Sequence, residues 1–156
     1  VDTLGIIRIR SDVERKRLFG VTTNSQNNID SGIYSAQASE KTYDKLAKLA
    51  ASIINAGYSV IIDAAFLKYK QRQVFQQLAE HLNISFVILE ILASAETLRQ
   101  RIKQRKNDIS DADLNVLNHQ LESHQPLHQD EQTKMISINT EEPVHLNQLI
   151  NKITAI

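Results

Sequence analysis

Two carboxylates stand at the ends of apolar runs in this sequence. Asp12 follows the run IIRIR, and Asp63 closes SVIID within the stretch SVIIDAAF. Ligands of open parallel sheets bind beyond the carboxyl ends of the strands, so two aspartates at such ends predict a site for a metal ion and a phosphate. Each aspartate alone fits a cap equally well, Asp12 for the helix that follows it and Asp63 for the loop that follows it.

A second candidate feature is the basic segment AETLRQRIKQRK, residues 95–106. If it is helical, Arg101 and Arg105 lie one turn apart, next to the side that Leu98 and Ile102 bury. Guanidinium groups match the oxygens of a phosphate, so this pair predicts a clamp on an anion. The alternative is a basic face that only meets solvent.

Other polar side chains do not predict a site. Three histidines, His119, His124 and His128, lack a carboxylate at a spacing typical of metal ligands, and the chain has no cysteine. They indicate a polar helix end. Glu90 stands inside an apolar run, and the sequence gives no function for it.

Strands and helices are expected to alternate along the chain. The apolar, β-branched runs predict four strands, at residues 5–10, 58–63, 84–92 and 134–139. Helical spacing predicts helices over 12–20, 39–56, 69–82, 95–106 and 111–124, with a last one after Pro143.

The ends of these helices have predicted caps. Ser11 with Asp12, Ser39, and Ser110 with Asp113 are the expected N-terminal caps, and Gly20 and Gly57 the expected stops. Residues 21–32 are expected to form a loop. Because the strands at 58–63 and 84–92 lack polar alternation, we expect both of their faces to be covered. This predicts a three-layer α/β domain with a parallel sheet.

Composition sets limits on the class of protein. A chain of 156 residues predicts a single domain, and 18 basic against 18 acidic side chains give no general attraction to nucleic acid or to a membrane surface. No apolar run approaches the length of about 20 residues that spans a bilayer. We therefore expect a soluble, cytoplasmic protein.

Four segments in order resemble one known group. They are IRSDVERKRLFG, TYDKLAKLAASIINAGYSVIIDAAFL, KQRQVFQQLAE and LRQRIKQRKNDISDADLNVLNHQLE. Together they look like the small P-loop kinases of the AAA/zeta-toxin-like group, over residues 5–150. Kinases of this group are often fused behind a domain similar to aminoglycoside phosphotransferases, so the resemblance implies an upstream domain in the same polypeptide.

The resemblance implies a role for each matching residue. Asp12 is the base or orienting group for the acceptor hydroxyl, and Arg15 binds substrate or phosphate. Asp63 serves Mg²⁺, through water, or positions the acceptor. Arg72 contacts phosphate or substrate. The lid over the nucleotide phosphates is formed by Arg101 and Arg105, and the loop near the adenine by residues 139–143.

One part of the family pattern is missing. The sequence G-x-x-x-x-G-K-[ST] occurs nowhere, and none of the four glycines precedes Lys-Ser or Lys-Thr. The family's first strand, phosphate loop and first helix are expected to precede residue 1, which makes residues 1–156 a single partial P-loop kinase domain.

The missing strand has a consequence for the sheet. The family's strand order 2-3-1-4-5 leaves an empty slot between the strands of Asp63 and Glu90. Three outcomes follow: the chain belongs to a longer protein, another copy fills the slot, or the strand at 58–63 pairs directly with that at 86–92.

These features together predict an ATP- and Mg²⁺-dependent phosphotransferase that acts on a hydroxyl of a small molecule. The 156 residues alone are expected to be inactive. One alternative is a nucleotide-sensing or interaction module without catalysis, and another is a toxin-like kinase of nucleotide sugars.

Overall fold

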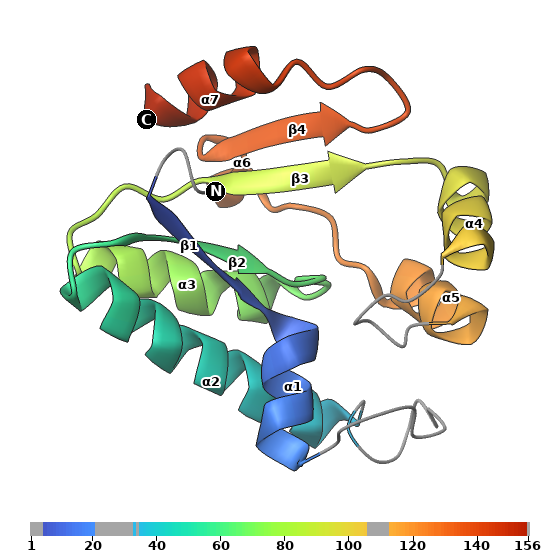
Figure 1. Cartoon of the computed structure of the whole chain (residues 1–156), viewed down its shortest axis with the longest axis horizontal. Coiled ribbons are helices and arrows are strands. Elements are labelled where there is room, and N and C mark those ends of the chain that lie inside the picture. Colours follow the sequence, from blue (N-terminus) through green and yellow to red (C-terminus); the bar gives the residue numbers. More distant parts are fainter. Residues whose placement is uncertain (1–4, 21–32, 34, 106–112, 156) are drawn as a thin grey trace. The chain divides into compact units, whose positions relative to one another are not determined.

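The chain alternates strands and helices in the computed structural model, which describes residues 5–20, 33, 35–105 and 113–155. The elements are β1 (Ile6–Arg10), α1 (Ser11–Phe19), α2 (Ala36–Asn55), β2 (Ser59–Asp63), α3 (Tyr69–His81), β3 (Ile88–Leu92), α4 (Ala95–Gln104), α5 (Leu114–Ser123), α6 (Gln129–Gln132), β4 (Met135–Asn139) and α7 (Leu146–Thr154) (Figure 1). The four predicted strands are confirmed. The short helix α6 was not predicted, because four residues carry no periodic pattern.

The chain divides into two compact units. The first contains residues 1–66 and 106–116, and the second contains residues 67–105 and 117–156. Helix α5 begins in one unit and ends in the other. Each unit has its own pair of parallel strands.

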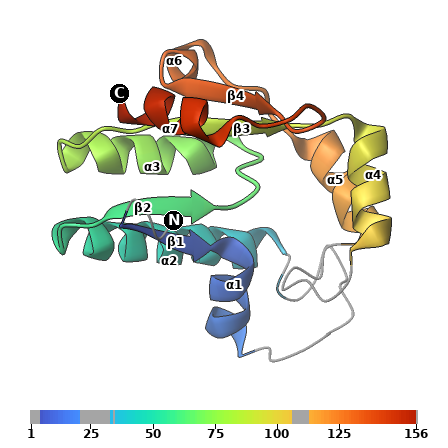
Figure 2. The ribbon, with the colours of Figure 1, turned by 45° about the horizontal axis from the view of Figure 1, so that its top comes forward.

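The first unit is built on the parallel pair β1–β2. Ile6 lies opposite Ser59, and Arg10 lies opposite Asp63. Parallel neighbours need a crossover, and α1 and α2 provide it. Helix α2 packs against both strands (Figure 2).

Helix α2 supplies the core of this unit through residues at helical spacing. Leu46 and Ala50 are fully buried, with 0% of their surface exposed. Ala38, Thr42 and Tyr43 are buried one and two turns earlier. The Thr42 hydroxyl donates to the carbonyl oxygen of Ala38 at 2.7 Å, so this polar side chain is satisfied inside the core.

Helix α1 ends as predicted but begins differently. Gly20 is left-handed, with a φ of 65°, and its N–H is directed at the carbonyl oxygens of Arg17 and Lys16. The predicted capping by Ser11 and Asp12 is wrong, because the N-cap residue is Arg10 and no side chain caps the helix. Asp12 lies in the first turn, where its charge still favours the helix dipole.

Helix α2 begins earlier than predicted. The N-cap is Ser35, whose Oγ accepts the N–H of Ala38 at 3.2 Å. Ser39 is already one turn inside the helix and donates its N–H to Ser35. The stop at Gly57 is confirmed by its φ of 86°.

Helix α5 is capped by Asp113, whose Oδ1 accepts the N–H groups of Asn115 and Val116, both at 2.9 Å. Its predicted partner Ser110 and the predicted loop 21–32 lie outside the described residues.

The second unit is built on the parallel pair β3–β4. Ile88 lies opposite Met135, and Leu92 lies opposite Asn139. Helix α7 runs beside β4 in both views (Figures 1 and 2). Glu90 finds its partner across the ladder, since the Ser137 hydroxyl donates to Glu90 Oε2 at 2.7 Å. This gives Glu90 a structural role that the sequence did not reveal.

The prediction of full coverage is wrong for β3. Ile91 is 60% exposed and Leu92 is 44% exposed. The strand also begins at Ile88, where β4 supplies its partner, and not at residue 84. Apolar composition predicted the strand, but coverage depends on neighbours that composition does not specify.

The strand pairs are the ones that the resemblance implies. Strands 2 and 3 of the family order correspond to β1–β2, and strands 4 and 5 correspond to β3–β4. Direct pairing of residues 58–63 with 86–92 is not among the pairs of the described residues. The fold is α/β with parallel strands, as expected; its three-layer arrangement stays a prediction.

Candidate functional site

The carboxyl end of the β1–β2 sheet holds Asp63 together with two arginines. Arg8 donates to Asp63 Oδ2 through Nε at 3.1 Å and also through Nη2. Arg10 Nε lies 3.5 Å from the same oxygen. Asp63 therefore ends its strand as predicted, but with two guanidinium groups beside it that the sequence analysis did not single out. The signal was present in the alternation Ile-Arg-Ile-Arg, which places both arginines on one face of a strand.

The D-x-x-R segment lies on helix α1. Asp12 is half-buried in the first turn, and Arg15 is buried one turn later, with 8% of its surface exposed. Arg15 Nη1 donates to the carbonyl oxygen of Ile33 at 2.8 Å. Arg15 thus binds the backbone of a residue that lies 18 positions later in the sequence.

Tyr43, which the sequence pattern did not single out, joins this neighbourhood. Its hydroxyl oxygen accepts the N–H of Phe66 at 3.0 Å, and the two rings lie 5.3 Å apart. Phe66 has a φ of 46°, which is rare for a bulky residue. Tyr43 therefore stabilises a strained turn three residues after Asp63.

Burial raises the pKa of the Tyr43 hydroxyl above its ordinary value. The Phe66 N–H and the charge of Arg15 act in the opposite direction, and Asp12 adds a smaller rise. Tyr43 thus stays a neutral phenol near neutral pH.

In the second unit, Arg72 is held inside the protein. Its Nε and Nη2 donate to the two carboxylate oxygens of Glu131, at 2.6 and 2.9 Å. Nη1 donates to the carbonyl of Gln125 and Nη2 to that of Pro126, both at 3.1 Å. Arg72 is 5% exposed and Glu131 is 1% exposed. These contacts give Arg72 a structural role in joining α3 to residues 125–131.

Glu131 stays charged despite its burial. Burial opposes the charge, but the hydrogen bonds from Arg72 and from the His128 N–H, together with the charge of Arg72, outweigh it. They hold the pKa of Glu131 below its ordinary value.

Nearby, Tyr69 stacks on His128 with ring centroids 4.0 Å apart and donates its hydroxyl to Asp130 at 2.9 Å. The hydrogen bond to Asp130 raises the pKa of the Tyr69 hydroxyl.

Arg101 reaches the loop after β4. Its Nη1 donates to Thr140 Oγ1 at 2.7 Å and its Nη2 to the Thr140 carbonyl oxygen at 2.8 Å. Thr140 in turn donates its N–H and its hydroxyl to the carbonyl oxygen of Leu92. Arg105 is the C-cap residue of α4, and both arginines are exposed.

Glu141 closes the other end of α4. Its Oε1 accepts the N–H of Ser94 at 3.2 Å, the Ser94 hydroxyl at 2.7 Å, and the Thr97 hydroxyl. These bonds, that of Thr97 first, lower the pKa of Glu141. Polar groups of the chain therefore form hydrogen bonds with one another at the carboxyl end of the β3–β4 sheet.

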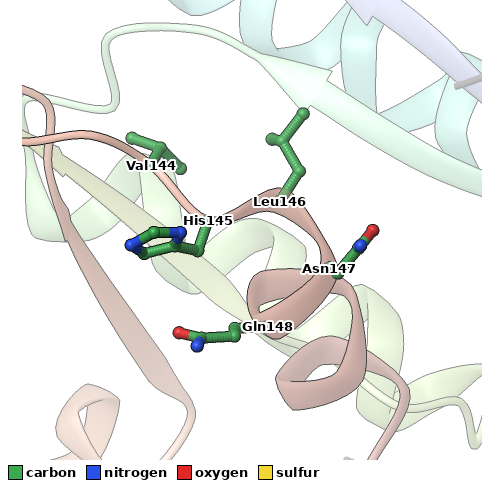
Figure 3. Close-up of a pocket in the computed structure, with 5 residues that line it drawn as sticks. All are labelled: Val144, His145, Leu146, Asn147 and Gln148. Carbon is green, nitrogen blue, oxygen red and sulfur yellow. The ribbon is translucent and has the colours of Figure 1, made fainter.

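A shallow hollow lies at the start of α7, directly after the predicted adenine loop 139–143. It is lined by Val144, His145, Leu146, Asn147 and Gln148. Figure 3 shows that these five side chains point in different directions around the first turn of the helix and do not converge on one point. The role predicted for residues 139–143 stays a prediction.

The predicted site residues are divided between the units. Asp12, Arg15 and Asp63 belong to the first unit; Arg72, Arg101 and Arg105 belong to the second. Within the described ranges, no three His, Cys, Asp or Glu side chains are grouped so that they could hold a metal ion. None of the described helices is long and apolar enough to cross a membrane.

The fold is similar to that of a solved gluconokinase from Sinorhizobium meliloti 1021, with a TM-score of 0.58 and 16% identity. The match covers 91% of this chain and 72% of the gluconokinase chain. Together with the parallel strands, this likeness defines an α/β fold of the P-loop NTPase-like type.

The model of a family described as "AAA domain" matches residues 1–127. The chain belongs to this AAA-domain family. It is also 27% identical over 117 residues to uncharacterized proteins of Mycobacterium bovis and Mycobacterium tuberculosis. That match covers 74% of this chain and 24% of each relative, so the chain spans about a quarter of their length.

Proposed function

We propose that this chain is part of an ATP-dependent kinase that transfers a phosphoryl group to a hydroxyl of a small molecule. One observation carries the proposal: Asp63 ends β2, and Asp12 lies in the first turn of the helix that follows β1, at the same edge of a parallel sheet. In α/β folds this edge is where ligands bind. Family membership makes a nucleotide the first ligand to test.

The proposed roles follow from the needs of phosphoryl transfer, which are positioning and charge neutralisation. Asp12 orients the acceptor hydroxyl or takes its proton, with Arg15 holding the substrate or the phosphate. Asp63 fits Mg²⁺ by chemistry, since the ion prefers carboxylate oxygens and keeps several waters. Arg8 and Arg10 compete for the same carboxylate, and this favours contact with the ion through water.

In the second unit, Arg101 and Arg105 are the proposed clamp on the nucleotide phosphates. Their exposure supports this role, because an exposed guanidinium can turn toward a ligand without loss of core packing. To bind phosphate oxygens, Arg101 has to give up its hydrogen bonds to the hydroxyl and carbonyl oxygens of Thr140. The burial of Arg72 favours a structural role over the predicted contact with phosphate.

The 156 residues contain no G-x-x-x-x-G-K-[ST], so they lack the backbone cradle and lysine of a P-loop. We therefore propose that residues 1–156 are one partial kinase domain of a cytoplasmic protein, that this chain turns over little or no ATP, and that another part of the same polypeptide supplies the phosphate loop. An upstream domain similar to aminoglycoside phosphotransferases is part of this proposal.

The test compares two polypeptides in one assay. The 156-residue chain and the product of the whole reading frame are incubated with Mg²⁺ and γ-labelled ATP, together with a panel of hydroxyl-bearing metabolites that includes nucleotide sugars. We expect transfer only from the longer polypeptide, and its loss in the Asp12→Asn variant. Turnover of ATP by the 156 residues alone would contradict the proposed inactivity.

A second candidate is a nucleotide-sensing module without catalysis. It is favoured by the contacts of Asp63, Arg72 and Arg101, each of which already binds groups of the chain. The same assay separates the two candidates. Binding of ATP by the longer polypeptide without transfer to any acceptor would support the sensing module.

A further inference from the structure

We propose that Arg8 and Arg10, which pair with Asp63 in this structure, form a binding site for a negatively charged group, a phosphate or a carboxylate, on the acceptor molecule. The inference rests on the proposed function, because it assigns these two arginines to the acceptor side of that same site. It adds a substrate class: the acceptor carries an anion besides the hydroxyl that receives the phosphoryl group.

The first argument is geometric. In the parallel register, Arg8 lies opposite Ile61 and Arg10 lies opposite Asp63, so these side chains share one face of the β1–β2 sheet. Both guanidinium groups reach the same carboxylate oxygen, Asp63 Oδ2. Two planar guanidinium groups therefore lie close together near the carboxyl end of the sheet.

The second argument concerns charge and access. Two guanidinium groups share one carboxylate oxygen of Asp63, so an external anion could take the place of that carboxylate. The side chains of Arg8 and Asp63 are 47% and 41% exposed, and that of Arg10 is 28% exposed. A ligand can therefore reach the trio from solvent. Arginine forks match the oxygens of phosphate and carboxylate in two-point contacts, which makes such an anion the fitting ligand.

The third argument is location. Arg10 is the N-cap residue of α1, and Asp12 follows in the first turn of that helix. An anion held by Arg8 and Arg10 would lie at the same sheet edge as the carboxylate proposed to orient the acceptor hydroxyl. One molecule with an anionic group and a hydroxyl could then be held at two points, which is what in-line transfer requires.

In the absence of a ligand, Asp63 acts as an internal competitor. Its carboxylate contacts the guanidinium groups of Arg8 and Arg10 that an external anion would use. This predicts opposite effects of neighbouring substitutions: neutralising either arginine weakens anion binding, whereas Asp63→Asn strengthens it. A site of generic positive charge would respond in the same directions but with similar effects for every arginine.

The experiment is a titration of the 156-residue chain with inorganic phosphate, followed by NMR of the arginine Nε–H groups at constant ionic strength. We expect saturable shifts at Arg8 and Arg10, about tenfold weaker binding in Arg8→Gln and Arg10→Gln, and tighter binding in Asp63→Asn. Arg99→Gln is the matched control, because Arg99 is exposed and lies outside the trio. Acetate replaces phosphate in a second arm.

Exposed ion pairs contribute little to folding, so the variants should keep the circular dichroism spectrum of the parent chain. Shifts that do not saturate, or equal losses in Arg99→Gln and Arg8→Gln, would overturn the inference. A third arm adds ATP and Mg²⁺ to the product of the whole reading frame. Competition with phosphate at Arg8 would assign the site to the nucleotide and overturn the acceptor assignment.

Failure of this inference is distinguishable from failure of the proposed function. Phosphoryl transfer with no anion binding at Arg8 and Arg10 overturns the inference alone. Saturable anion binding without phosphoryl transfer to any acceptor overturns the proposed function, and the acceptor assignment with it.

Discussion

Arg72 and Glu131 form the most buried ion pair among the described residues, and their contribution to stability can be measured. Removing one partner of such a pair leaves the other buried and charged, which costs about 3–5 kcal/mol. We expect Arg72→Met to lower the free energy of unfolding by this amount in urea denaturation followed by circular dichroism.

The double variant Arg72→Met/Glu131→Leu is the control. Replacing both charges with apolar groups is often neutral, so the double variant should recover most of the loss. Equal urea midpoints for the parent chain and Arg72→Met would show that the pair contributes nothing.

Glu131 also predicts how stability depends on pH. Its pKa in the folded chain is lower than the value of 4.5 expected for an unfolded glutamate. Its contribution is therefore fully present above about pH 4.5 and is lost as the pH falls through the lower, folded value. Urea denaturation between pH 6 and pH 3 should show this loss in the parent chain. The double variant should show a shallower decline in that range.

Tyr43 offers a test of the turn that follows Asp63. Tyr43→Phe keeps the ring but removes the oxygen that accepts the Phe66 N–H. Leaving a partly buried donor without its acceptor costs about 1–3 kcal/mol. We expect a lower urea midpoint and faster hydrogen exchange at the Phe66 amide. Tyr58→Phe is the matched control, because Tyr58 is 55% exposed; an equal effect in both variants would remove the special role of Tyr43.

At the scale of elements, helix α4 is fixed to the loop after β4 near both of its ends. Ser94 caps its N-terminus by accepting the Thr97 N–H at 3.2 Å, and Glu141 accepts from Ser94 and Thr97. Arg101 joins the second turn of α4 to Thr140. Helix α4 and residues 139–141 should therefore respond together to a change in either.

Ser94→Ala tests this coupling. Loss of the cap should lower stability by about 1 kcal/mol. Hydrogen exchange should rise at the first-turn amides of α4 and also at Glu141, since Asn139 and Ser94 orient the same loop. Ser52→Ala is a suitable control, because the Ser52 hydroxyl donates to a carbonyl oxygen inside α2 and caps nothing. Exchange that rises only within α4 would contradict the coupling.

The elements also show what local sequence could and could not predict. Gly20 and Gly57 were correct stops, because a left-handed residue at a helix end favours glycine through its own backbone. The N-terminal cap of α2 was predicted at Ser39 but is Ser35. Both serines can cap a helix, and only packing decides which of them begins α2. The short helix α6 contains Glu131, which is held by an ion pair with Arg72. Because Arg72 lies 59 residues away in the sequence, no local pattern around α6 could predict this contact.

At the scale of the whole molecule, the positions of the strands along the chain and the fold class followed from the alternation of apolar runs, whereas the pairing of the strands followed from the family resemblance. The candidate site was only partly predictable. Asp63 could be singled out because it ends an apolar run, but its partner Arg8 lies 55 residues away and becomes a neighbour only through the parallel register. Tyr43 was hidden because a tyrosine at a core-facing helical position usually serves packing alone.

The first compact unit combines residues 1–66 with residues 106–116, so it is discontinuous in the chain. A polypeptide cut after Phe66 would keep β1, β2 and α2 but lose Val116, which is 6% exposed and belongs to the same unit. The unit cannot be completed during synthesis until the intervening segment 67–105 has been made. Its formation on the ribosome would therefore wait for the second half of the chain.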